Sequence, residues 1–84
     1  MTYRVTIKGS ARKELEALPD PLLRRVDATI VGLSRDPRPR GCMRVRGTDL
    51  YRIRCGDYRV LYRVNDQAEI VEVVAIGHRR EIYR

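Results

Sequence analysis

The strongest constraint on the fold lies in residues 50–64, where two alternating segments are separated by Gly56-Asp57. A Gly-Asp pair at such a position is typical of a two-residue β-hairpin loop. The loop sets the register of the two strands, and a slip by one residue would exchange their faces. The pairs predicted across this hairpin are Cys55–Tyr58, Arg54–Arg59 and Arg52–Leu61.

This predicted hairpin has one apolar and one basic face, because side chains alternate along a strand. Like charges that are directly opposed destabilise a sheet by ~0.2–1 kcal/mol per pair. The Arg54–Arg59 pair therefore favours a phosphate-binding surface, since guanidinium groups bind phosphate bidentately; a solvated basic surface is the alternative. The basic side chains, which we call the arginine face, are Arg52, Arg54, Arg59 and Arg63, and the apolar ones are Tyr51, Ile53, Cys55, Tyr58, Val60, Tyr62 and Val64.

The remaining segments predict an α+β fold in a single domain over residues 1–84. Alternation over residues 3–7 indicates a first strand. Two helices follow, with Ser10 as the predicted N-cap of the first and Asp20 as that of the second, which would extend to about residue 35. A proline-containing loop then leads to four strands. The order β-α-α-β-β-β-β predicts a helical hairpin on one face of a mainly antiparallel four-strand run over residues 43–46, 50–55, 58–64 and 69–76.

Charge is the first indication of function. The chain has a net charge of +7, and eight arginines but only two aspartates lie between Pro37 and Arg63. Such a field attracts a polyanion or an acidic protein partner, and a solvated surface is again the alternative. Arg44 and Arg46 belong to this stretch, so we include them with Arg63 among the predicted phosphate-binding residues.

Composition narrows the cellular context. No apolar run approaches the ~20 residues that a membrane-spanning helix needs, and the first residues do not resemble a signal segment. We therefore expect a cytoplasmic protein that does not associate with membranes and whose two cysteines are reduced. A single histidine and the lack of clustered carboxylates give a metal ion little to bind, and no metal or cofactor is expected.

Three stretches resemble a known family. Residues 50–62, LYRIRCGDYRVLY, are similar to the central block of the RelE/ParE toxin superfamily. Residues 76–83, IGHRREIY, are similar to its closing block, and DPRP at 36–39 with VRG at 45–47 also fits. The resemblance covers essentially the whole chain.

This resemblance implies the toxin of a type II toxin–antitoxin pair. RelE-like members are ribosome-dependent, metal-independent endoribonucleases that cleave mRNA in the decoding site, and a cognate antitoxin protein neutralises them in a hetero-oligomer. Cleavage uses the RNA 2′-OH as the nucleophile on phosphorus, so it needs a proton acceptor and cations for the pentavalent phosphate.

The resemblance also implies roles for particular residues. Arg59 matches the arginine that stabilises the phosphate, Arg79 one that supports the transition state or leaving group, and Tyr83 a tyrosine that stacks on a base. Arg52 and Arg54 stand where ribonuclease members often carry lysine, and arginine is a poor general acid or base. The proton is then moved by His78, Tyr83 or Glu81, or it passes largely to solvent. Of the three side chains, histidine has the ordinary pKa best suited to a base at neutral pH.

Two other interpretations stay open at this point. A ParE-like toxin would share the fold but inhibit DNA gyrase. A relic would bind RNA or antitoxin with little turnover, which the missing lysines would favour. Codon preference, the antitoxin family, the complex stoichiometry and the degree of activity do not follow from the sequence.

Overall fold

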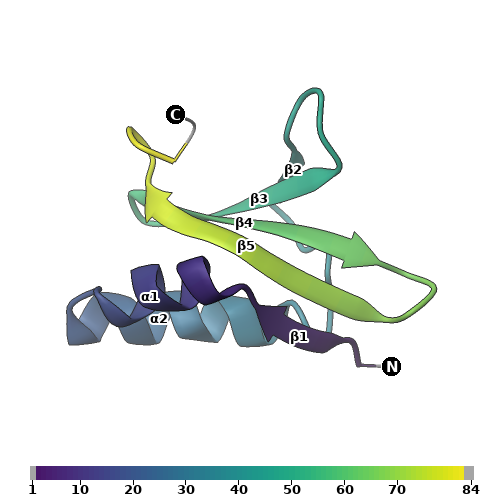
Figure 1. Ribbon diagram of the computed structural model, residues 1–84, viewed down its shortest axis with the longest axis horizontal. Helices are drawn as coiled ribbons and strands as arrows, with labels where there is room; N and C mark the ends of the chain where they lie inside the picture. The colour runs from purple at the N-terminus through teal and green to yellow at the C-terminus, as the bar shows by residue number, and fades with distance from the viewer. Residues whose placement is uncertain (1, 83–84) are drawn as a thin grey trace.

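The computed structural model describes residues 2–82 and places them in two layers (Figure 1). Two helices, α1 (Gly9–Glu16) and α2 (Asp20–Gly32), lie on one side of the sheet. The strands are β1 (Arg4–Ile7), β2 (Met43–Arg44), β3 (Leu50–Cys55), β4 (Tyr58–Asn65) and β5 (Ile70–His78). The α+β class and the order of elements are as predicted.

The sheet has five strands, not only the four of the predicted run, in the order β1-β5-β4-β3-β2. The first strand joins it parallel to β5, with Arg4 paired to Ile70, while the other pairings are antiparallel. A parallel pair requires a long crossover connection, and the two helices supply it.

Both helices begin earlier than predicted. Lys8, not Ser10, is the N-cap of α1, and Pro19, not Asp20, is the N-cap of α2. Neither N-cap side chain makes a capping hydrogen bond. Asp20 instead lies in the first turn of α2, where a carboxylate interacts favourably with the helix dipole. The second helix ends at Gly32 and the second strand at Arg44, both before their predicted ends.

The core lies between the helices and the apolar face of the sheet. Tyr62, Val60 and Ile53 occupy its centre, as the predicted alternation requires. A β-bulge in β5 opposes Leu61 with Ala75 and Tyr62 with Val73. Strict alternation would place residues 73 and 76 on opposite faces, and the extra residue lets both face the helices. The buried core residues are Ala11, Leu15, Val26, Ile30, Leu33, Ile53, Cys55, Val60, Tyr62, Val71, Val73 and Ile76.

Among residues 2–82, no helix is both long and apolar enough to cross a membrane. Cys42 and Cys55 are free thiols, as predicted.

Candidate functional site

The hairpin of β3 and β4 has the register that the Gly56-Asp57 loop predicts. Cys55 pairs with Tyr58, and Arg54 pairs directly with Arg59. Since paired residues share a face of the sheet and the apolar side chains meet the helices, the arginine face points away from the helix layer.

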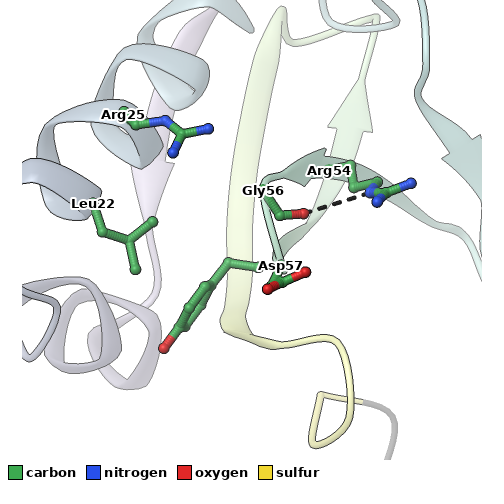
Figure 2. A pocket seen from close by; sticks show the side chains of 6 residues that line it. Leu22, Arg25, Arg54, Gly56 and Asp57 are labelled. Carbon is green, nitrogen blue, oxygen red and sulfur yellow. Dashed lines mark hydrogen bonds between the residues drawn. The ribbon is translucent and has the colours of Figure 1, made fainter.

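A cavity of about 340 Å³ opens on the arginine face. Arg52 donates a hydrogen bond from Nη2 to Sδ of Met43 at 3.1 Å, and Arg54 Nε lies 3.5 Å from the carbonyl oxygen of Gly56 (Figure 2). Both contacts are weak, so each guanidinium keeps most of its donors for a ligand. The cavity is lined by Gly41, Met43, Arg52, Arg54 and Arg59.

Arg59 is the most unusual group in this cavity. Its Nε and Nη1 atoms are buried, and within residues 2–82 no atom accepts a hydrogen bond from either of them. A buried donor without an acceptor costs about 1–3 kcal/mol, and more when the group is charged. Arginine cannot relieve this cost by losing a proton. The arrangement therefore favours an anionic ligand that accepts both donors.

Arg63 lies on the same strand and face, but it is already neutralised. Its Nε is 2.9 Å from a carboxylate oxygen of Asp49, and its Nη1 is 2.9 Å from one of Glu72. The hydrogen bond from Arg63 lowers the pKa of Asp49. Of the two predicted phosphate contacts on β4, the structure leaves Arg59 with unpaired donors and gives Arg63 two carboxylates.

Arg44 and Arg46 do not line the cavity around Arg59, but with Val45 and Arg52 they line a neighbouring cavity of about 350 Å³. Arg44 is paired with Tyr51, which places it on the sheet face opposite the arginine face. Its guanidinium lies 5.6 Å from the centre of the Tyr51 ring, and its Nε donates to the carbonyl oxygen of Thr48. Arg46 is exposed in the turn that follows β2. Both residues remain accessible to a polyanion, and Arg52 connects their cavity to the cavity around Arg59.

His78 also lies away from Arg59. It pairs with Tyr58, and its ring meets the Tyr58 ring edge-on with centroids 5.5 Å apart, on the helix side of the sheet. Its Nδ1 accepts a hydrogen bond from the backbone N–H of Arg80. Gly77, not His78, is the partner of Arg59 on β5.

The segment after β5 turns back over the arginine face. A Cβ placed on Gly77 would lie 3.5 Å from Cβ of Ile82, so Ile82 packs beside the Arg59 pairing position. The backbone N–H of Arg79 donates to the carbonyl oxygen of Asp57, and the Arg79 side chain is exposed. Arg79 is thus near the end of the hairpin that carries Arg59. The predicted site residue Tyr83 lies outside the described residues.

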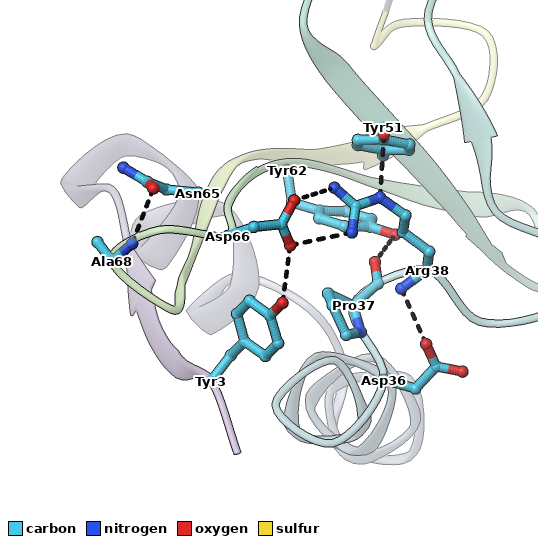
Figure 3. A network of polar contacts seen from close by, with 9 residues as sticks. All are labelled: Tyr3, Asp36, Pro37, Arg38, Tyr51, Tyr62, Asn65, Asp66 and Ala68. Atoms are coloured by element: carbon cyan, nitrogen blue, oxygen red, sulfur yellow. Dashed lines mark hydrogen bonds and ion pairs between the residues drawn. The ribbon is translucent and has the colours of Figure 1, made fainter. Parts of the chain in front are cut away.

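One polar network was not expected from the sequence (Figure 3). Arg38 binds both carboxylate oxygens of Asp66, at 2.8 and 3.1 Å, and its Nε donates to the Tyr51 hydroxyl. Tyr3 donates to the same carboxylate, and these two donors lower the pKa of Asp66 to about 2. Arg38 therefore holds the loop at 36–41 against the sheet instead of adding a free cation to the surface. A charge count along the sequence could not distinguish these two roles.

Metal-binding side chains are not clustered in the described part of the chain. Residues 2–82 contain no group of three His, Cys, Asp or Glu side chains that could hold a metal ion.

Residues 5–83 match a family described as "ParE toxin of type II toxin-antitoxin system, parDE". The chain belongs to the RelE/ParE family of toxins. It is 36% identical to Toxin RelG of Mycobacterium tuberculosis, an alignment that covers 100% of this chain and 99% of the relative. It is therefore a toxin of a type II toxin–antitoxin system.

Solved structures of RelE/ParE toxins share this fold. The RelE chain in the RelE–RelB complex of Pyrococcus horikoshii superposes with a TM-score of 0.85 at 37% identity, covering 96% of this chain and 99% of that one. The toxin–antitoxin complex RelBE2 of Mycobacterium tuberculosis gives a TM-score of 0.80 at 31% identity, covering 93% and 99%.

Proposed function

We propose that this toxin is a ribosome-dependent endoribonuclease that cleaves mRNA by attack of a 2′-OH on the adjacent phosphate. The observation that carries the proposal is the pair of buried, unpaired donors on Arg59 in a cavity shared with Arg52 and Arg54. A phosphate gains charge as it becomes pentavalent, and preorganised donors stabilise that charge most strongly where water is excluded. The relatives named RelG and RelE favour a RelE-like function over a ParE-like function.

The roles proposed for the arginines combine their surroundings with the resemblance to RelE-like toxins, which alone suggests the role of Arg79. Arg59 binds the scissile phosphate, and Arg52 and Arg54 add charge on the neighbouring strand. Arg79, exposed at the end of β5, supports the leaving 5′-oxygen. All four act electrostatically because their protons are not available for transfer at neutral pH.

The side chains considered as proton acceptors are less favourably placed than the arginines. His78 is on the far face of the sheet, and Asp49 and Glu72 are bound by Arg63. We propose that water is the main proton acceptor and that the arginines supply most of the rate enhancement. Such an enzyme would be slower than one with a positioned base, which typically contributes 10²–10⁴-fold.

We further propose that a cognate antitoxin neutralises this toxin in a hetero-oligomer by covering the arginine face. The RelE relatives of known structure include complexes with RelB antitoxins. Carboxylates of the partner would accept the Arg59 donors and thereby occupy the place of the phosphate.

The experiment is to incubate the purified toxin with ribosomes carrying a defined mRNA and to map the ends of the products. We expect cuts within the decoding site that leave a 2′,3′-cyclic phosphate, because the 2′-oxygen is the nucleophile. Ribosome-free mRNA provides the control. Intact mRNA on the programmed ribosomes would contradict the proposal.

The family description names ParE, so gyrase inhibition is the second candidate. A supercoiling assay with purified DNA gyrase separates the two activities. Inhibition of supercoiling together with intact mRNA would establish the ParE-like function, and inactivity in both assays would favour a binding relic.

A further inference from the structure

A second cavity, of about 410 Å³, lies at the turn between β3 and β4, where the hairpin meets α2. Leu22 and Arg25 extend toward it from α2, and Gly56 and Asp57 form its other side (Figure 2). The Arg25 guanidinium approaches the turn closely: a Cβ on Gly56 would lie 3.6 Å from its Nη2. None of these four residues lines the cavity around Arg59, and Tyr58 and Arg54 complete the lining.

The lining combines apolar surface with one donor group and one acceptor group. Leu22 and Tyr58 supply the apolar and aromatic surface. The Arg25 guanidinium supplies donors and the Asp57 carboxylate supplies acceptors, and neither forms an ion pair within residues 2–82. A nucleobase has a flat apolar face and an edge with both donors and acceptors, so it matches this set. An acidic peptide matches less well because it would meet the Asp57 carboxylate.

Arg54 connects the two cavities. It lines the cavity at the turn as well as the cavity around Arg59. A phosphodiester on Arg54 would therefore join a phosphate at Arg59 to a nucleoside at the turn. An RNA backbone bears one charge per nucleotide, so a spaced series of guanidinium groups suits its path.

We propose that the cavity lined by Leu22, Arg25, Asp57 and Tyr58 binds the base of a nucleotide next to the scissile phosphate of single-stranded RNA. This inference rests on the proposed ribonuclease function and adds to it a base-binding subsite on the helix side of the hairpin. Arg25 and Asp57 contact the edge of the base, and Tyr58 and Leu22 contact its face. Stacking makes binding tolerant of sequence, while the Asp57 carboxylate favours bases with an amino or imino donor.

The test is binding of short fluorescent 2′-O-methyl RNAs to the full chain, measured by anisotropy at one fixed salt concentration. These RNAs lack the nucleophilic hydroxyl, so binding is read without cleavage. We expect Arg25→Ala to weaken binding by about tenfold, consistent with the loss of base contacts. Arg24→Ala is the matched control, since Arg24 is the adjacent exposed arginine of α2 and does not line the cavity. It should change affinity by about twofold or less through net charge alone.

A second variant tests base recognition. Asp57→Asn replaces a pure acceptor by a group that both donates and accepts. We expect it to change the relative affinities for the four homopolymeric RNAs, whereas a merely electrostatic effect would raise all four together.

Equal effects of Arg25→Ala and Arg24→Ala, with an unchanged order of homopolymers for Asp57→Asn, would overturn the inference. A loss of antitoxin affinity in Arg25→Ala without a loss of RNA affinity would also overturn it, by making the cavity a protein-docking site. Arg59→Ala in the same assay separates the two proposals. If Arg59→Ala weakens RNA binding and Arg25→Ala does not, the subsite fails and the phosphate site stands. If neither variant weakens binding, or if the unmodified chain binds no RNA, the subsite fails, and cleavage on programmed ribosomes decides the proposed function separately.

Discussion

Arg59 and Arg63 lie four residues apart on one strand and on one face, yet their surroundings differ. Arg63 has two carboxylates at 2.9 Å, and Arg59 has two buried donors without an acceptor in the described part of the chain. In the first arrangement, carboxylates of the protein itself accept the hydrogen bonds of the guanidinium. The second arrangement destabilises the folded state until an anion binds. Binding and catalytic sites commonly reduce stability in this way.

Stability measurements test this difference. Arg59→Ala removes a buried, uncompensated charge, so we expect a melting temperature equal to or above that of the unmodified chain. Arg63→Ala breaks exposed ion pairs that are each worth about 0–1 kcal/mol, so a slight decrease is expected. Calorimetry on both variants supplies the comparison. A larger decrease for Arg59→Ala than for Arg63→Ala would mean that Arg59 supports the fold.

His78 provides a second test at this scale. Because its imidazole packs on Tyr58 on the helix side, we expect His78→Gln to leave the rate of mRNA cleavage and its pH profile nearly unchanged. A loss of about 100-fold, typical of removing a general base, would show instead that the ring reaches the nucleophilic 2′-OH.

At the scale of elements, the loop at 36–41 shows how the rest of the fold positions the site. Arg38 and Asp66 tie this loop to the turn between β4 and β5, and the Tyr62 hydroxyl donates to the carbonyl oxygen of Pro37 at 2.7 Å. The loop ends at Gly41, which lines the cavity of Arg59. A network at one end of the sheet thus fixes one wall of the proposed phosphate site.

The pH dependence of stability tests the network. The pKa of Asp66 is about 2 in the folded state and 3.8 in its ordinary range. A depressed carboxyl pKa stabilises the fold above the ordinary pKa, and this contribution is lost as pH falls through the folded pKa. The melting temperature of Asp66→Asn should therefore lie below that of the unmodified chain at pH 6 and approach it near pH 2. Asp27→Asn, an exposed substitution on α2, is the control. If the melting temperature of Asp66→Asn differed from that of the unmodified chain by the same amount at both pH values, the role assigned to Asp66 would be contradicted.

Local patterns predicted some elements well and others poorly. The hairpin register was predictable because a two-residue loop leaves the strands only one alignment. The parallel pairing of β1 and the bulge in β5 were not, since both depend on contacts between distant segments. The predicted N-caps Ser10 and Asp20 were wrong, because the helices begin after Lys8 and Pro19 without a side-chain cap. The placement of Arg44 could not be known without the register of β2.

At the scale of the whole molecule, the core and the arginine face lie on opposite sides of the sheet. The helices cover the apolar face of the sheet and leave the arginine face free, and the chain carries a net charge of +7. A basic surface of this kind serves both proposed partners, the mRNA and an acidic antitoxin segment. The two would compete for the same guanidinium groups.

Titration with the cognate antitoxin tests this competition. A ligand that binds only the folded state stabilises it by about 2.7 kcal/mol at a concentration 100-fold above its Kd. We expect the melting temperature to rise with antitoxin concentration and RNA to be displaced in parallel. An unchanged melting temperature at saturation, or simultaneous binding of both ligands, would show that the antitoxin does not cover the arginine face.

The most direct test of the phosphate site is single-turnover cleavage of mRNA on programmed ribosomes by the unmodified toxin, Arg59→Ala and Arg63→Ala. Loss of the Arg59 contacts to the pentavalent phosphate should cost ~2–4 kcal/mol, a rate decrease of roughly 30- to 1000-fold. Arg63→Ala should stay within about threefold, since its guanidinium is already bound by carboxylates. Cleavage by Arg59→Ala at the unmodified rate would contradict the role assigned to the unpaired donors of Arg59.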